Sequence, residues 1–141
     1  MKACLVLPAF VLLLGLAGCA TSLEKANRFY SQGNFVKANT YFLRAVDEQK
    51  SQAVLPEWNG KGYAYHFSAP VAAAAIFGAG NCARQMQRRN LALYYYFYYV
   101  QFVTRHSLDT ETQFAEIREY LRHEDANGDD AQRLNSLLRC K

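Results

Sequence analysis

The sequence predicts an all-α domain of stacked antiparallel helix hairpins, closed by a C-terminal capping helix. Apolar residues recur at steps of three and four along several segments, as they do on one face of an α-helix. Turn-forming residues such as Gly33-Asn34 separate these segments, and the most strand-like run has no partner strand. We therefore expect residues 19–141 to form a single helical repeat-like domain.

The first residues predict a signal peptide. Lys2 precedes an apolar run from Ala3 to Leu16, and the small residues Ala17-Gly18 follow. A run of about fourteen residues is shorter than the roughly 20 residues that a membrane-spanning helix needs. We expect residues 1–18 to be absent from the mature protein.

The four residues Leu16-Ala17-Gly18-Cys19 resemble the lipobox of bacterial lipoproteins. The resemblance implies cleavage before Cys19 and a diacylglyceryl group on its thiol, which anchors a chain because each buried methylene contributes about 0.8 kcal/mol. Ala20 is not the aspartate that often retains such lipoproteins at the inner membrane, which implies the periplasmic face of the outer membrane. An ordinary signal peptide with a coincidental cysteine is the alternative.

Lipidation would leave two cysteines available, because Cys4 departs with the signal peptide. In an oxidising compartment we predict a disulfide between Cys82 and Cys140. It would close a loop of about 58 residues and stabilise the fold by roughly 4 kcal/mol. Two buried thiols are the alternative.

Residues 23–48 predict the first helix hairpin. Its small and aromatic residues stand at helical spacing, namely Ala26, Phe29, Tyr30, Gly33, Phe35, Ala38, Phe42 and Ala45. This pattern resembles a tetratricopeptide repeat, in which small residues permit close packing and aromatic residues fill the space between two helices. Ser22 and Lys25 depart from it at large apolar positions, and Lys50 departs from it at the closing proline.

Three further segments complete the expected stack. Residues 56–78 predict a second hairpin, opened by Trp58, Gly62 and Tyr65 and ending in a short alanine-rich helix. Residues 83–124 predict a third hairpin, in which one long helix runs from about Ala83 to Arg105. Residues 130–139 predict the capping helix. A strand is the alternative for the aromatic part of the long helix.

Six consecutive aromatic residues, 94–99, wind around more than one face of the predicted long helix. We predict that part of this cluster contacts a partner, because tyrosine combines rigid contact area with a polar hydroxyl group. The candidate residues are Tyr94, Tyr95, Tyr98 and Tyr99. The alternative is a central core helix with tyrosine hydroxyls at the edge of the core.

The charge pattern and motifs predict no enzyme, metal site, cofactor or nucleic-acid partner. The formal charge is +4, and loss of Lys2 leaves +3 without a large basic cluster. No nucleophile motif or metal-ligand spacing is present. Residues 125–130 resemble half of a calcium-binding EF-hand loop, but Asp130 and Ser136 occupy the positions that need glycine and glutamate.

These expectations lead to a membrane-anchored periplasmic lipoprotein that acts as a protein–protein interaction adaptor or assembly factor, like a pilotin or an envelope-complex component. Its expected partners are an envelope protein or peptide and, through the lipid, the membrane. The alternatives are a lipoprotein that binds cell-wall glycans and a structural lipoprotein that self-associates. The sequence leaves the oligomeric state open.

Overall fold

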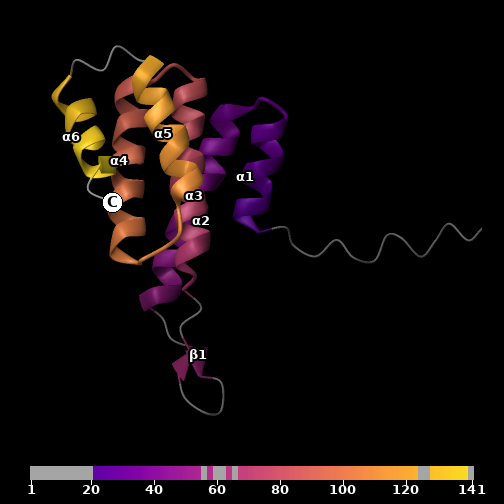
Figure 1. Ribbon diagram of the computed structural model, residues 1–141. Helices are drawn as coiled ribbons and strands as arrows, with labels where there is room; N and C mark the ends of the chain where they lie inside the picture. The colour runs from indigo at the N-terminus through magenta and orange to yellow at the C-terminus, as the bar shows by residue number, and fades with distance from the viewer. Residues whose placement is uncertain (1–20, 55–56, 59–62, 65–66, 124–127, 140–141) are drawn as a thin grey trace, which may run out of the picture.

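The computed structural model describes residues 21–54, 57–58, 63–64, 67–123 and 128–139, and it confirms the all-α prediction (Figure 1). Within this part of the chain, no helix is both long and apolar enough to cross a bilayer. The elements are, in order, α1 (Ser22–Ser31), α2 (Phe35–Val54), β1 (Glu57–Trp58), β2 (Tyr63–Ala64), α3 (Ala69–Gln85), α4 (Arg89–Arg105), α5 (Glu111–His123) and α6 (Asp129–Arg139).

The hairpin of α1 and α2 begins with a capping box. The Thr21 hydroxyl accepts a hydrogen bond from the backbone N–H of Glu24 at 3.2 Å, and the Glu24 carboxylate accepts one from the Thr21 N–H at 2.7 Å. Ser22 Oγ then donates to Glu48 Oε1 at 2.6 Å, which brings the start of α1 level with Glu48 on α2. This is the predicted first hairpin, with α2 continuing to Val54.

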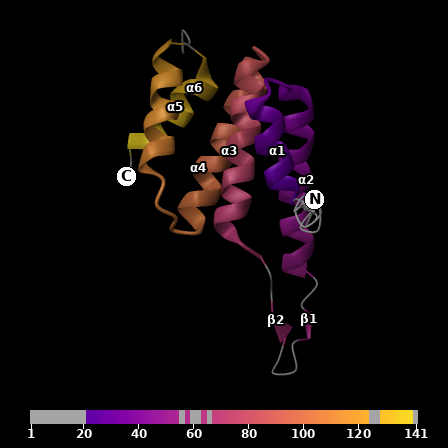
Figure 2. The ribbon, with the colours of Figure 1, turned by 90° about the vertical axis from the view of Figure 1, so that its right-hand side faces the viewer.

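The helices stack side by side, because α2 packs on α1 and α3, α3 packs on α4, and α6 packs on α4 and α5 (Figures 1 and 2). The central helix, α3, buries mainly small residues, which let its neighbours approach closely. A Cβ atom at Gly80 would meet the ring of Tyr96 on α4 at 2.7 Å. Large aromatic residues of the neighbouring helices thus fill the space that the small residues of α3 leave.

The hairpin of α3 and α4 repeats the hairpin of α1 and α2 at an offset of 54 residues. Gly33 and Gln87 hold equivalent places in the two turns, with φ angles of 73° and 57°. The buried residues Ala38, Phe42 and Ala45 of α2 correspond in the same way to Ala92, Tyr96 and Tyr99 of α4. The equivalent turn hydrogen bonds run from Gly33 N–H to Tyr30 O, Asn34 N–H to Phe29 O, Gln87 N–H to Arg84 O and Arg88 N–H to Ala83 O.

Two parts of the predicted helix pairing are wrong. Residues 56–78 do not form the second helix hairpin, because β1 and β2 pair antiparallel there with Trp58 opposite Tyr63. The expected long helix from Ala83 to Arg105 is interrupted after Gln85, since Gln87 adopts a left-handed conformation and the chain reverses. The reversal allows the small residues of α3 to pack against the aromatic residues of α4, so the third hairpin is α5–α6 in place of 83–124.

Candidate functional site

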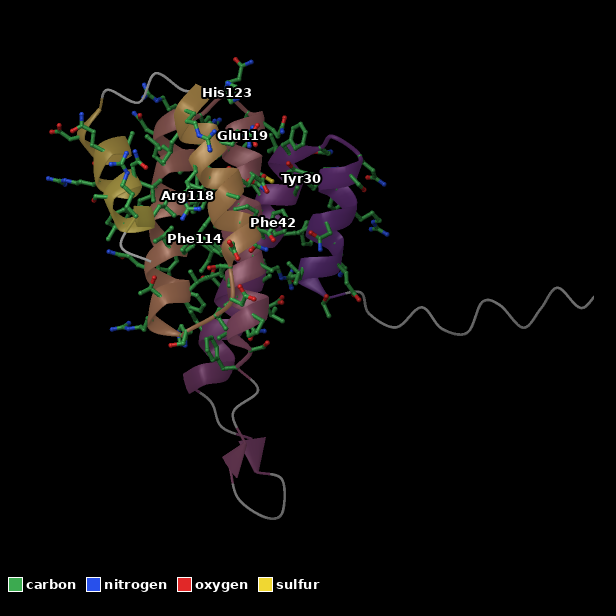
Figure 3. All side chains as sticks on the ribbon, viewed as in Figure 1. Tyr30, Phe42, Phe114, Arg118, Glu119 and His123 are labelled. Atoms are coloured by element: carbon green, nitrogen blue, oxygen red, sulfur yellow. The ribbon has the colours of Figure 1, made fainter. Side chains whose placement is uncertain are left out.

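A groove of about 480 Å³ lies along α3, between the α1–α2 hairpin and α5. Its floor carries Ala74 and Phe77 of α3. Tyr30 of α1 and Phe42 of α2 line one side, and Figure 3 shows both side chains between their hairpin and α5. In Figure 2 the two flanking helices, α1 and α5, lie on opposite sides of α3. The groove is therefore formed by helices from all three hairpins.

Three amide side chains line this groove, each from a different helix. They are Asn27 of α1, Asn81 of α3 and Gln113 of α5. The Tyr96 hydroxyl donates to Asn81 Oδ1 at 2.6 Å, which orients the Asn81 amide from beneath. An amide offers both N–H donors and a carbonyl acceptor, the same pair of groups that a polypeptide backbone presents. The groove can therefore form hydrogen bonds with an extended peptide along its length.

The rest of the lining is largely apolar and carries little charge. Leu108, Pro70 and Tyr99 add apolar surface around Phe77. Among the described residues that line the groove, Asp109 carries the one charged side chain. The composition suits a neutral or weakly basic ligand, because a buried carboxylate on the ligand would meet no cation here.

One end of the groove is held together by contacts that join α1, α3 and α5. Burial raises the pKa of Tyr30, while a hydrogen bond with Gln85 of α3 acts in the opposite direction. Arg84 of α3 lies 3.8 Å from the Glu116 carboxylate of α5 and 5.2 Å from the centre of the Tyr120 ring. These contacts join α1 to α3 and α3 to α5 beside Tyr30, which itself lines the groove.

The predicted partner-binding tyrosines do not form one surface. Tyr94 is 63% exposed, and Tyr94, Tyr95 and Tyr98 line a separate hollow of about 260 Å³ between α2 and α4. Tyr99 is 2% exposed and packs against Phe77 and Phe114, with only its groove-facing edge accessible. Tyr99 therefore lines a different hollow from the other three, because a step of one residue turns a helix by about 100°. Partner binding by these four tyrosines stays a prediction.

Two tyrosines of α4 belong to the core. Burial raises the pKa of Tyr99 to about 12, and it raises the pKa of Tyr96 as well. The Tyr96 ring meets the Tyr120 ring edge to face at 5.5 Å, and its hydroxyl is satisfied by Asn81. These rings therefore position the groove floor from below.

Of the three cysteines singled out from the sequence, only Cys82 lies within the described residues. It lies on α3, fully buried and not bonded to another cysteine among the described residues, and burial raises the pKa of its thiol to about 12. Cys140 and Cys19 lie outside the described residues. The disulfide and the lipid attachment therefore stay predictions.

The amides of the groove were not predicted from the sequence. Asn27, Asn81 and Gln113 carry no motif of their own, and they come together only when α1, α3 and α5 are aligned. The offset of 54 residues could have indicated Asn81, because it stands 54 positions after Asn27 in the repeated hairpin. No group of three or more potential metal ligands occurs among the described side chains.

Comparisons with protein-family models, curated protein sequences and solved structures find no significant match to the chain. The fold and the groove themselves define the class of protein, which is an all-α domain of stacked, repeat-like helix hairpins. Its surface is hollowed where the first helices of the three hairpins meet.

Proposed function

We propose that this chain is a non-enzymatic adaptor, anchored by Cys19 to the periplasmic face of the outer membrane, which binds an extended segment of an envelope protein. The observation that carries the binding proposal is the groove along α3, with amide side chains from three helices above an apolar floor. Its volume of about 480 Å³ falls within the usual range of ligand sites, roughly 300–1,000 Å³. Binding there would help the partner protein assemble in the envelope.

The groove supports recognition of a peptide backbone together with modest apolar side chains. Amide pairs can hold the backbone in register, while Phe77 and Phe42 receive apolar side chains of the ligand. Because Asp109 is near one end, a basic or neutral residue fits better there than an acidic one.

Ala74→Arg is the most direct test, because Ala74 is exposed on the groove floor and arginine would fill the groove without harming the helix. Ala115→Arg is the matched control, since Ala115 is exposed on α5 but does not line the groove. A photoreactive residue at Leu108, which lines the groove but is not one of its amides, should crosslink one envelope protein in intact cells, and the Ala74→Arg change should abolish the adduct. The adduct should survive Ala115→Arg, and an adduct equally strong in both variants would refute the proposal.

A second candidate function rests on the outer face of α4. Tyr94 is 63% exposed and meets Tyr95 edge to face at 5.5 Å, beside the hollow that they share with Leu43 and Lys50. A structural lipoprotein could self-associate through this surface. Sedimentation that depends on protein concentration and is lost in Tyr94→Ala would favour it. Concentration-independent sedimentation would exclude it.

A further inference from the structure

The β1–β2 ladder projects from one end of the helical stack (Figure 1). Ser22 is level with Glu48 of α2, while the Ser68 N–H, just before α3, donates to Gln49 Oε1 at 2.7 Å. Beyond Gln49, α2 continues to Val54 and extends by about 8 Å at 1.5 Å per residue. The last part of α2 and the two strands therefore stand beyond the starts of both α1 and α3.

The projecting ladder brings two aromatic residues into register. Trp58 of β1 lies opposite Tyr63 of β2, and Trp58 is the single tryptophan of the chain. Residues 55–66 contain Glu57 and Lys61, whose formal charges cancel, and His66, which is counted as neutral. Tryptophan and tyrosine concentrate at the boundary between lipid headgroups and acyl chains, where their rings are buried and their polar atoms stay wet.

The expected lipid anchor enters at this same end. Cys19 precedes Ser22 by three residues, and an extended chain spans at most about 3.6 Å per residue. An acyl-bearing Cys19 is thus held within about 11 Å of the start of α1. The anchor can therefore reach about as far as the end of α2, and the ladder follows beyond that end of the helix (Figure 1), so one bilayer can meet both the lipid and the ladder.

We propose that the β1–β2 ladder is a second membrane contact, with Trp58 and Tyr63 in the interfacial region of the bilayer that holds the Cys19 lipid. This inference rests on the proposed anchor. Two contacts at one end of the stack would fix the orientation of the domain and keep the groove at a constant height above the membrane. Because the segment carries balanced charge, the contact does not depend on anionic lipids.

The single tryptophan allows a direct test with the full lipidated protein. Mass spectrometry of the mature protein first establishes whether it carries the lipid. The protein is then reconstituted in phosphatidylcholine vesicles with brominated acyl chains, and its tryptophan emission is recorded. In vesicles of unbrominated lipid, emission from Trp58 should lie at shorter wavelength than that of a water-exposed tryptophan. In the brominated vesicles it should lose most of its intensity. The matched control is Trp58→Phe with Tyr94→Trp. It moves the probe to an exposed site in the first two turns of α4, the helix that begins at the end of the stack away from the ladder.

The control protein should keep its emission maximum and its intensity in the same vesicles. Quenching at position 94 equal to that at position 58 would overturn the proposal, because the domain would then have no fixed orientation. A protein that carries the lipid but shows no quenching of Trp58 would also overturn it, while leaving the anchor intact. A mature protein without lipid would refute the anchor and this inference together, and the crosslinking from Leu108 would still test the groove.

Discussion

The ring of Phe42 on α2 lies directly against the backbone of Gly78 on α3, so that a methyl group at position 78 would overlap the ring atoms. This contact joins the first hairpin to the second, and both residues line the groove. The absence of a side chain at Gly78 is therefore what sets the distance between these two hairpins.

Replacing Gly78 with alanine should destabilise the protein by about 1–2 kcal/mol. Overpacking against Phe42 costs roughly 1–3 kcal/mol, and the better helix propensity of alanine returns up to about 1 kcal/mol. Urea unfolding measures the change in the free energy of unfolding. In a Phe42→Leu background the same substitution should be neutral or stabilising, and an unchanged cost there would show that Phe42 is not the cause.

Gln87→Gly should stabilise the protein by about 0.5–1 kcal/mol. Gln87 has a φ of 57°, which is unfavourable for a residue with a Cβ atom, and its equivalent in the first turn is Gly33. The control is Gln101→Gly, because Gln101 is exposed within α4 and glycine should cost about 1 kcal/mol there. Thermal unfolding of the two variants should change in opposite directions, and a loss of stability in both would argue against the left-handed turn.

Stability should fall as the pH rises from about 10 to about 12. Burial raises the pKa of Tyr99 in the folded protein to about 12 from the ordinary value of 10.0, so over this range the unfolded chain loses the proton first. The contribution of the protonated Tyr99 to the free energy of unfolding is complete below pH 10. It declines above pH 10, by up to about 2–3 kcal/mol at pH 12. Tyr99→Phe should make this decline shallower in unfolding experiments, while Tyr96 and Cys82, whose pKa values burial also raises, still contribute to it. An equally steep decline in the variant would place its origin elsewhere.

The predicted Cys82–Cys140 disulfide should be tested in unfolded protein. Cys82 is fully buried and the pKa of its thiol is raised to about 12, so an unpaired Cys82 would react slowly in the folded protein and could not be told from a paired one. In mature protein denatured without reductant, we expect no reactive thiol, and after reduction we expect two. Two reactive thiols before reduction would contradict the bridge and favour the buried-thiol alternative.

The parts of the fold that local patterns determine were predictable. The α1–α2 hairpin combines a glycine at its left-handed turn with apolar residues at helical spacing, so its position and its buried face follow from neighbouring residues alone. The second hairpin was misplaced because its turn has Gln87 in the place of the glycine. Its first helix, α3, is rich in alanine and glycine, which give a weak periodic pattern.

The candidate site was less predictable for a related reason. The run of aromatic residues predicted a contact surface on α4. In the folded protein Tyr94 is exposed, whereas Tyr99 is buried because α3 and α5 cover its side of the helix. The groove amides carry no sequence motif, and their common function depends on the alignment of three helices that are distant along the chain.

Local patterns were enough to predict the helical class and the first hairpin, because periodicity, capping and turn chemistry act over a few residues. The resemblance of Leu16-Ala17-Gly18-Cys19 to a lipobox likewise predicts the anchor at Cys19. Packing in the folded chain determines where the chain reverses after Gln85 and which tyrosines are buried. It also decided that Asn27, Asn81 and Gln113 line one groove. These outcomes depend on packing between distant segments, above all on small residues of α3 that accept the rings of Phe42 and Tyr96.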